Sequence, residues 1–210
     1  MFYLVKTPWW LRLLYRKCVW VKPSTEKVLY LTFDDGPHPE VTSFVLDELR
    51  KFGAKASFFC IGKNVLAHPA MYRRIQEEGH GIGNHTFNHL NGWKTTDEDY
   101  VKDIAMAGQV INSKFFRPPY GKIRYSQVKK LTTAPFHFKL IMWSVLSADF
   151  DKSVSDEECL QYVLRNSKKG SIIVFHDSEK AFDRMRYALP RVLKHFHENG
   201  YRFEKLEEVP

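Results

Sequence analysis

Two patterns of apolar residues alternate along the chain, and together they predict an α/β fold. In the first, short runs of consecutive apolar residues end at glycine, proline or a polar residue, as buried strands do. In the second, apolar residues recur every three or four positions, the period of an amphipathic helix. The expected strands cover residues 28–32, 56–61, 81–84, 115–116, 140–143, 171–175 and 201–203. The expected helices cover residues 41–52, 65–78, 96–112, 155–166 and 183–198.

The alternation of strands with helices indicates a parallel sheet covered by helices. About seven such units in 210 residues suggest a single-domain, distorted β/α barrel that is imperfectly closed. We expect this catalytic domain to span residues 26–210. An aromatic and basic segment over residues 1–25 precedes it and is expected to pack on the barrel or extend from it. The candidate site residues all follow predicted strands, where β/α barrels place their active sites.

The first 20 residues are rich in aromatic residues and leucine, but basic side chains interrupt them. We therefore expect neither a membrane-spanning helix nor a secretory signal, and predict a cytoplasmic protein or one bound at the membrane periphery. Four apolar residues lie close to helical spacing: Trp9, Trp10, Leu13 and Leu14. They fit an amphipathic helix that lies on a membrane through residues 1–20. We favour a helix packed across the base of the domain, because aromatic stripes belong more often to a core.

The composition is that of a globular protein with a basic surface: 44% of residues are hydrophobic, 27% are charged, and the formal net charge is +8. The sequence has no run of lysines and arginines of the kind that binds a nucleic-acid backbone, so we expect no nucleic-acid partner. Anionic glycans, phosphate-bearing polymers and anionic lipid head groups remain open as partners. The odd set of Cys18, Cys60 and Cys159 predicts no disulfide framework, which favours a reducing compartment.

Two neighbouring acids and a pair of histidines have the composition of a catalytic metal site. His85 and His89 lie four positions apart, a spacing that places two imidazoles on one face of a helical turn. With Asp35 they offer two nitrogens and one oxygen, and three protein ligands leave positions open for water. Thr86 is expected to hydrogen-bond within the turn and hold the imidazoles. Asp34 is then a spare carboxylate beside the water, the minimum equipment for hydrolysis.

Later segments supply further polar groups. Arg117 precedes two prolines that stiffen its loop, so its guanidinium can pair with a carboxylate and keep that carboxylate ionised. The same rigid loop presents the main-chain N–H of Tyr120 at a fixed place. His176 follows the apolar run of residues 171–175. Beside a buried acid such as Asp149, this histidine can stay protonated near neutral pH and act as a general acid.

In this order, the segments Thr-Phe-Asp-Asp-Gly-Pro, His-Thr-x-x-His, Arg-Pro-Pro-Tyr and the late His-Asp resemble the NodB-type polysaccharide deacetylases, carbohydrate esterase family four. The resemblance covers the chain from Val28 onward and implies the distorted (β/α)7 barrel of that family. It implies that Asp34 is the catalytic base and that Arg117 tethers this base. It also implies that His176 is the catalytic acid and that Asp149 is the acid that tunes it. It also implies that the main-chain N–H of Tyr120 is the oxyanion donor and that the metal ligands are Asp35, His85 and His89.

Two positions depart from the family pattern. The family usually has tryptophan at the position of Phe150 and leucine at that of Val174. Both positions line the apolar recess for the acyl methyl group. The departures therefore concern the size of the recess and leave the charged groups intact.

The resemblance implies a metal-dependent hydrolase that removes N-acetyl groups from amino-sugar units of a chitooligosaccharide or peptidoglycan type of glycan. Zinc is the expected metal, with cobalt, nickel and manganese as alternatives. Two other interpretations stay open. The aromatic and basic residues 1–20 motivate a deformylase or deacylase that acts on a lipid-linked amino sugar or a small amide. The remaining interpretation is a glycan-binding module without catalytic activity.

Overall fold

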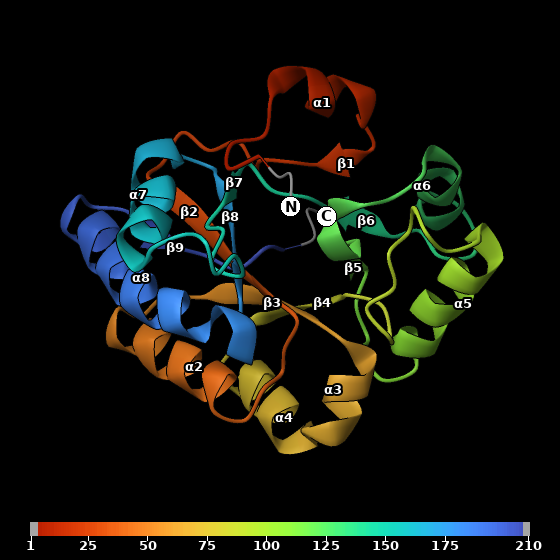
Figure 1. Ribbon diagram of the computed structural model, residues 1–210, viewed down its shortest axis with the longest axis horizontal. Coiled ribbons are helices and arrows are strands. Elements are labelled where there is room, and N and C mark those ends of the chain that lie inside the picture. The colour runs from red at the N-terminus through yellow and green to blue at the C-terminus, as the bar shows by residue number, and fades with distance from the viewer. Residues whose placement is uncertain (1–3, 208–210) are drawn as a thin grey trace.

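The computed structural model describes residues 4–207 as a curled parallel sheet surrounded by helices (Figure 1). The strands, in chain order, are β1 Cys18–Val19, β2 Val28–Asp34, β3 Ala56–Cys60, β4 Gly81–Asn84, β5 Phe115–Phe116, β6 Lys139–Ile141, β7 Val145–Leu146, β8 Ile172–His176 and β9 Arg202–Phe203. Their order across the sheet is β1-β6-β5-β4-β3-β2-β8-β7, and β9 pairs with β2 beside this path. No ladder joins β1 to β7 within the described residues, so the barrel is open, as predicted.

Strand register brings the carboxyl ends of the central strands to one rim. Asp34, the last residue of β2, pairs with His176 of β8 on one side and with Phe59 of β3 on the other. Asn84, the last residue of β4, pairs with Cys60 of β3. Because neighbouring parallel strands end at the same edge, this pairing gathers side chains that lie far apart in the sequence.

The helices that cover the sheet are α2 Val41–Lys51, α3 Gly62–Ala67, α4 Pro69–Glu77, α5 Asp97–Gly108, α6 Tyr125–Thr132, α7 Asp156–Asn166 and α8 Glu179–Glu198. The prediction of one helix over residues 65–78 is wrong, because α3 ends at Ala67 and a second helix, α4, begins at Pro69. Proline disfavours helical geometry in the residue before it, here His68. The last helix begins at Glu179, earlier than predicted, and continues through Pro190. The sequence pattern predicts none of β1, β7 and α6, which are short.

Two of the predicted helix starts are fixed by local capping. The Thr96 side chain accepts the main-chain N–H of Asp99 at the start of α5. Ser155 and Glu158 form a reciprocal capping box at the start of α7. Both pairs satisfy N–H groups that a helix cannot satisfy internally.

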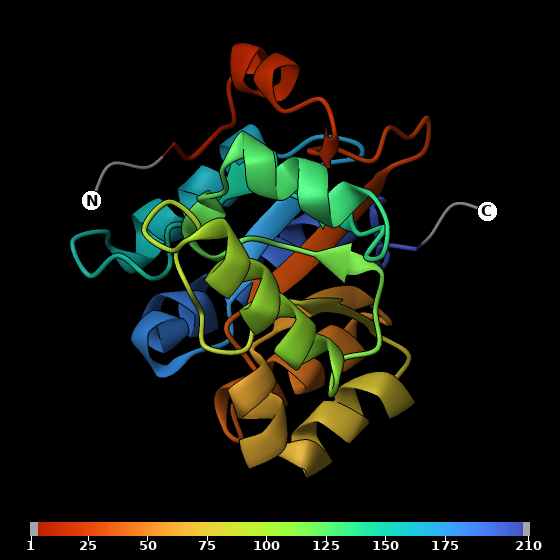
Figure 2. The same cartoon turned by 90° about the vertical axis from the view of Figure 1, so that its right-hand side faces the viewer.

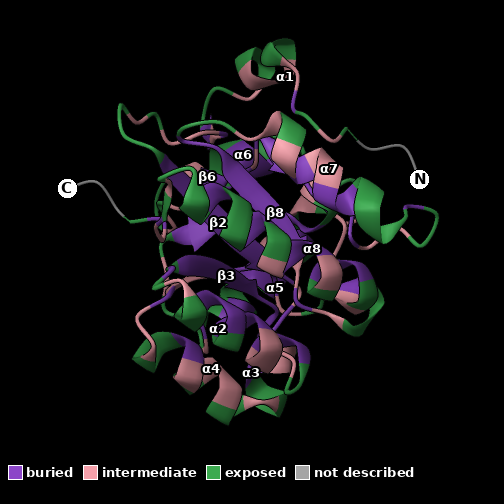
Figure 3. Cartoon of the chain, turned by 90° about the vertical axis from the view of Figure 1, so that its left-hand side faces the viewer, coloured by how far each residue is buried: buried purple, intermediate pink, exposed green. Residues whose placement is uncertain are grey.

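The main core lies between the sheet and helices α2, α7 and α8 (Figure 3). Phe33 of β2 stacks against Phe58 of β3 and Phe175 of β8, with ring centroids 5.1 and 6.1 Å apart. Every residue of β2 is buried, which is typical of a central parallel strand covered on both faces. This packing fixes the position of Asp34 at the end of the strand.

The N-terminal segment pairs with β7, which lies at one edge of the sheet. Lys6 forms an antiparallel bridge with Val145, and Thr7 Oγ1 donates to the carbonyl of Trp143 at 2.7 Å. Its helix α1, Trp9–Leu14, stands out from the barrel (Figure 2), and none of its residues is buried. The favoured prediction of a helix packed across the base of the domain is therefore wrong. No helix among residues 4–207 is long and apolar enough to cross a membrane.

The predicted division of the chain at residues 25 and 26 stays a prediction. Residues 1–3 of the predicted segment and 208–210 of the predicted domain lie outside the described residues. The three cysteines are buried free thiols.

Candidate metal and catalytic site

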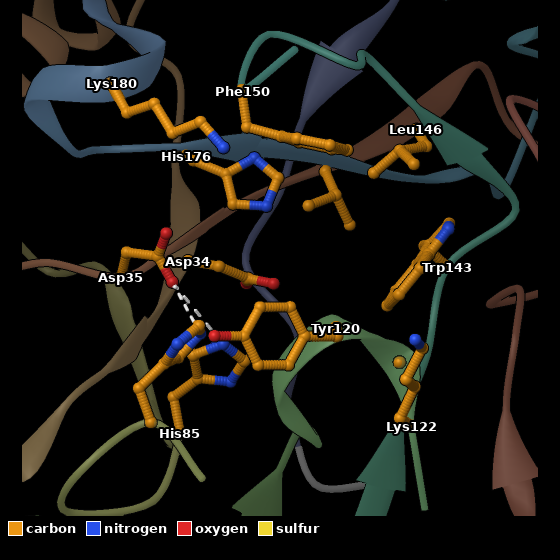
Figure 4. A pocket seen from close by; sticks show the side chains of 13 residues that line it. Asp34, Asp35, His85, Tyr120, Lys122, Trp143, Leu146, Phe150, His176 and Lys180 are labelled. Carbon is orange, nitrogen blue, oxygen red and sulfur yellow. Dashed lines mark ion pairs between the residues drawn. The ribbon is translucent and has the colours of Figure 1, made fainter. Parts of the chain in front are cut away.

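The candidate site is a cavity of about 250 Å³ at the carboxyl ends of the central strands (Figure 4). The predicted residues that line it are Asp34, Asp35, His85, His89, Tyr120, Phe150, Val174 and His176. The other two predicted residues, Arg117 and Asp149, are fully buried behind the lining. The fold thus brings the whole predicted set to one place.

Asp35, His85 and His89 direct one ligand atom each toward a common point. Oδ1 of Asp35 lies 3.1 Å from Nε2 of His89 and 3.7 Å from Nε2 of His85. A single ligand atom of each residue lies within 4.8 Å of the other two. Oδ1 of Asp35 is shielded from solvent and accepts no hydrogen bond from residues 4–207, an arrangement that a cation would complete. Two imidazole nitrogens and one carboxylate oxygen suit a divalent metal with open positions.

The charge state of Asp35 also suits a cation. Burial alone would raise the pKa of its carboxyl group. The imidazoles of His89, His176 and His85 oppose this effect and lower the pKa below its usual range. The carboxylate is therefore ionised and available as a ligand at neutral pH.

The turn after β2 directs Asp35 into the cavity. Its φ of 83° is left-handed, which is rare for a residue with a side chain, and its carbonyl accepts Nδ2 of Asn64 at 2.7 Å. Oδ1 of Asp177 accepts the N–H of Gly36 at 3.0 Å, and Oδ2 accepts the hydroxyl of Thr42 at 2.5 Å. A Cβ atom at position 36 would lie 2.0 Å from the Asp177 carboxylate, so only glycine fits there. Two consecutive acids can therefore enter one cavity.

The two histidines lie on an irregular loop after β4, and the predicted helical turn is wrong. Thr86 and His89 have φ values of 67° and 59°, which a right-handed helix does not contain. Thr86 hydrogen-bonds within the turn through its main-chain N–H, which donates to Oδ1 of Asn84 at 2.8 Å. Its buried hydroxyl has no hydrogen-bond partner within residues 4–207, so the side chain does not hold the imidazoles as predicted. Asp103 of α5 holds the loop instead: it accepts the main-chain N–H groups of Phe87 and Asn88 at 2.8 and 3.0 Å.

His85 is held in the tautomer that binds metals. Its Nδ1–H donates to the main-chain carbonyl of Arg117 at 2.7 Å, which leaves the lone pair on Nε2, facing Asp35. Burial lowers the pKa of this imidazole to about 4, so it is neutral at physiological pH. A neutral imidazole is the form that coordinates a cation.

Arg117 anchors the carboxylate of Asp34. Its Nη1 donates to Oδ1 of Asp34 at 2.6 Å and to the hydroxyl of Thr32 at 2.8 Å. Nε and Nη2 donate to the main-chain carbonyls of Ile141 and Met142, each at 3.1 Å. All three guanidinium nitrogens are thus bonded, as a buried cation requires. The ion pair orients the Asp34 carboxylate toward the cavity.

His176 is paired with Asp149 at the end of β8. Nδ1 of His176 lies 2.7 Å from Oδ1 of Asp149, and Oδ2 accepts the main-chain N–H of His176 at 2.7 Å. Burial opposes protonation, but the charge and hydrogen bond of Asp149 raise the pKa of His176 to about 9. The side chain is therefore an imidazolium at neutral pH. Nε of Arg184 donates to the main-chain carbonyl of Asp149 at 2.6 Å and so helps to hold Asp149 in place.

An apolar wall completes the cavity. It is formed by Trp143, Leu146, Phe150 and Val174. Phe150 meets His176 edge-on, with ring centroids 5.1 Å apart. Tyr120, in the left-handed region with φ 60°, packs its ring against His89 at 4.6 Å between centroids.

Sequence reasoning misses several residues of the site. It includes Trp143 in a predicted strand, but the strand pattern does not say that this ring and Leu146 face the cavity. It finds no signal for Lys122 and Lys180, which also line the cavity. The role of Asp177 at the Asp35 turn depends on a tertiary contact with β2, which no local pattern reveals.

The family model described as polysaccharide deacetylase matches residues 21–138, which contain the metal triad, Asp34 and Arg117. This chain belongs to the polysaccharide deacetylase family. The deacetylase is 35% identical over 196 residues to a peptidoglycan-N-acetylglucosamine deacetylase of Bacillus cereus, and the match covers 90% of this chain and 91% of that protein. It is 36% identical over 164 residues to a chitooligosaccharide deacetylase of Azorhizobium caulinodans, with 73% and 75% of the two chains covered.

A solved relative has the same fold as the deacetylase. It is a crystal structure of a peptidoglycan N-acetylglucosamine deacetylase in complex with 4-naphthalen-1-yl-N-oxidanyl-benzamide. The two structures superpose with a TM-score of 0.86 at 34% identity, over 95% of each chain. The predictions of a distorted α/β barrel and of a NodB-type polysaccharide deacetylase, a hydrolase, are confirmed. The predicted divalent metal fits both the family and the triad of Asp35, His85 and His89.

Proposed function

We propose that this polysaccharide deacetylase removes acetyl groups from N-acetylglucosamine units of a glycan. The observation that carries the proposal is the convergence of three metal-ligand atoms, the ion-paired carboxylate of Asp34 and the imidazolium of His176 on one cavity. The substrates named for the relatives, peptidoglycan and chitooligosaccharide, support N-acetylated amino sugars as the substrate class. The apolar wall beside these groups suits the methyl of an acetyl group.

The ligands of the metal in this proposal are Asp35, His85 and His89. Zinc is the metal that we propose, and cobalt, nickel and manganese are alternatives with the same ligand preference. A divalent cation bound there supplies Lewis acidity, which polarises the acetyl carbonyl and lowers the pKa of water. The protein side chains move the protons.

In the proposed reaction, Asp34 accepts a proton from water as the water oxygen bonds to the acetyl carbon. Arg117 keeps the carboxylate aimed at that water through the 2.6 Å ion pair. The main-chain N–H of Tyr120 stabilises the negative charge that develops on the carbonyl oxygen. His176, kept protonated by Asp149, donates its Nε2 proton to the amide nitrogen as the carbon–nitrogen bond breaks. Acetate and a free amino sugar leave the site.

Acetate release from chitooligosaccharides and from peptidoglycan fragments tests the proposal. We expect release from at least one of these substrates, loss of release with a chelator, and recovery when zinc is returned. Metal binding without acetate release from any acetylated glycan would contradict the proposal. That result would identify the chain as the non-catalytic glycan-binding module.

We also propose that α1 lies on an anionic lipid surface, which would place the deacetylase at the membrane periphery. Its four large apolar side chains are between 48% and 73% exposed: Trp9, Trp10, Leu13 and Leu14. Residues 4–25 contain five basic residues and no acidic one. Exposed tryptophan and leucine beside basic residues favour binding to the interface of anionic bilayers.

Sedimentation with vesicles of phosphatidylglycerol and phosphatidylcholine tests the contact. We expect the deacetylase to sediment with the anionic vesicles and expect Trp9→Ser to weaken this binding. Leu66→Ser is the matched control, because Leu66 is 59% exposed on α3. Equal binding of the two variants and the unchanged protein would contradict the proposal that α1 contacts the lipid surface.

A further inference from the structure

A second cavity lies beside the catalytic cavity and shares a wall with it. This cavity, of about 210 Å³, is lined on one side by Leu4, Pro8 and Leu11 of the N-terminal segment. On the other side, Trp143 and Leu146 line both cavities. Figure 4 shows these two side chains together at one side of the catalytic cavity. The two cavities are therefore adjacent, and a ligand that occupied both would cross the residues they share.

The second cavity is accessible from solvent. Three large side chains that line it are partly exposed: Leu4 at 37%, Tyr120 at 49% and Trp93 at 55%. Exposed apolar side chains around a hollow are typical of a binding site and uncommon elsewhere on a surface. The N-terminal segment thus forms one side of an open apolar hollow.

Four polar side chains around the hollow already donate to main-chain carbonyls. The hydroxyl groups of Thr7 and Tyr15 donate to main-chain carbonyls at 2.7 and 3.2 Å. The indole N–H groups of Trp20 and Trp93 also donate to main-chain carbonyls, at 3.2 and 3.1 Å. Lys122 and Tyr120 also line the hollow, but both line the catalytic cavity as well and so lie at the border between the two. Away from this border, a sugar ring would lose hydrogen bonds to water without regaining them, whereas an alkyl chain loses none.

We infer that the second cavity binds an apolar chain attached to the amino sugar, so that the substrate is a lipid-linked amino sugar. This inference rests on the proposed deacetylase function, because the sugar must present its acetyl group at the catalytic cavity. Leu11, which lines the hollow, belongs to α1. The proposed lipid contact of α1 would therefore bring the mouth of the cavity close to the surface that carries such a chain.

Deacetylation of the octyl and methyl β-glycosides of chitotriose tests the inference, at concentrations where neither forms micelles. Each buried methylene strengthens binding about fourfold, so we expect kcat/KM to be at least about tenfold higher for the octyl glycoside. We expect the difference to arise mainly in KM. Equal kcat/KM values for the two glycosides would overturn the inference while leaving the proposed function intact. Release of acetate from neither glycoside, with release from peptidoglycan fragments, would overturn the inference alone. Release from none of these substrates would overturn both.

A pair of leucine variants assigns the effect to the cavity. Leu11→Gln places an amide against the apolar chain and should reduce the ratio of octyl to methyl kcat/KM at least about threefold. Leu66→Gln on α3 makes the same change at a side chain that is 59% exposed and does not line the cavity, so the ratio should stay the same. Equal ratios in both variants would place the octyl chain elsewhere and overturn the assignment.

Discussion

Arg117 and Asp34 form an ion pair inside the barrel, with Nη1 2.6 Å from Oδ1 and side chains 0% and 4% exposed. Arg117 follows β5, whereas Asp34 ends β2, and two strands lie between them in the sheet. The guanidinium therefore reaches across the interior of the barrel to hold the proposed base. The pair has a structural role and a catalytic role, which different substitutions can separate.

Replacing Asp34 with asparagine tests the role of the base. Asp34→Asn keeps the size of the side chain but removes the proton acceptor, so kcat should fall at least about 100-fold, the low end for loss of a general base. Metal content should stay unchanged, because Asp35, His85 and His89 are intact. Acetate release and metal analysis on the same sample measure both effects. Turnover close to normal would contradict the assignment of Asp34 as the base.

Replacing Arg117 with methionine tests the structural role of the pair. Arg117→Met leaves the buried Asp34 carboxylate without its partner, so the free energy of unfolding should fall by about 3–5 kcal/mol. Urea unfolding measures this change. Arg186→Met is the control, because it breaks an exposed pair with Asp183 and should cost less than about 1 kcal/mol. Equal decreases in the free energy of unfolding of the two variants would show that burial does not increase the contribution of the Arg117–Asp34 pair to stability.

The imidazolium of His176 predicts an alkaline limit to activity. Its pKa is raised to about 9, so kcat should fall as the pH rises through about 9 and the acid is lost. Asp149→Asn removes the main cause of protonation and should move this limit toward lower pH. The pH profile of kcat for both proteins measures the shift. An unchanged limit in the variant would contradict the pairing of His176 with Asp149 as the source of the acid.

The same pKa has a consequence for stability. The folded-state pKa of His176, about 9, lies above the ordinary value of 6.5, so protonation stabilises the folded protein. This contribution is complete below pH 6.5 and is lost as the pH rises through about 9. The pH dependence of unfolding should therefore be weaker in Asp149→Asn across this range.

Metal removal should lower thermal stability as well as activity. A cation that binds only the folded protein adds about 2.7 kcal/mol when present at 100 times its Kd. In a chain of this size, Tm should therefore fall by about 5–10 °C when a chelator is added. Asp35→Asn weakens the ligand set and should abolish this difference, whereas Asp34→Asn should retain it. A chelator effect of equal size in both variants would exclude Asp35 as a ligand.

The sequence predicts which residues form the rim of the site, because these residues lie at the carboxyl ends of strands. Asp34 and His176 follow uninterrupted apolar runs, and the parallel pairing of buried strands is enough to bring such ends together. The spacing of His85 and His89 predicts their closeness but not their backbone, since both a helix and a loop can bring such residues together. The loop is set by Asp103 on α5, a contact between elements that local patterns do not encode.

The N-terminal helix shows a different limit of sequence reasoning. A stripe of Trp9 and Leu13 has the same period whether it faces a core or solvent. Only the surrounding surface decides between a core and solvent. Here Leu11 packs, partly buried, against a core cluster, whereas no residue of α1 is fully buried. The sequence does not place Trp143 and Leu146 in the apolar wall for the same reason, since the direction of these side chains depends on how the sheet curls.

Residues 4–25 supply one side of the second cavity but no lining residue of the catalytic one. One side of the second cavity and the proton-transfer groups are therefore encoded in separate stretches of the chain. Mutations in the leading stretch can broaden or narrow the range of acceptable substrates while the hydrolytic groups stay untouched. Such a division lets selection, or an engineer, retarget the enzyme by exchanging that stretch alone.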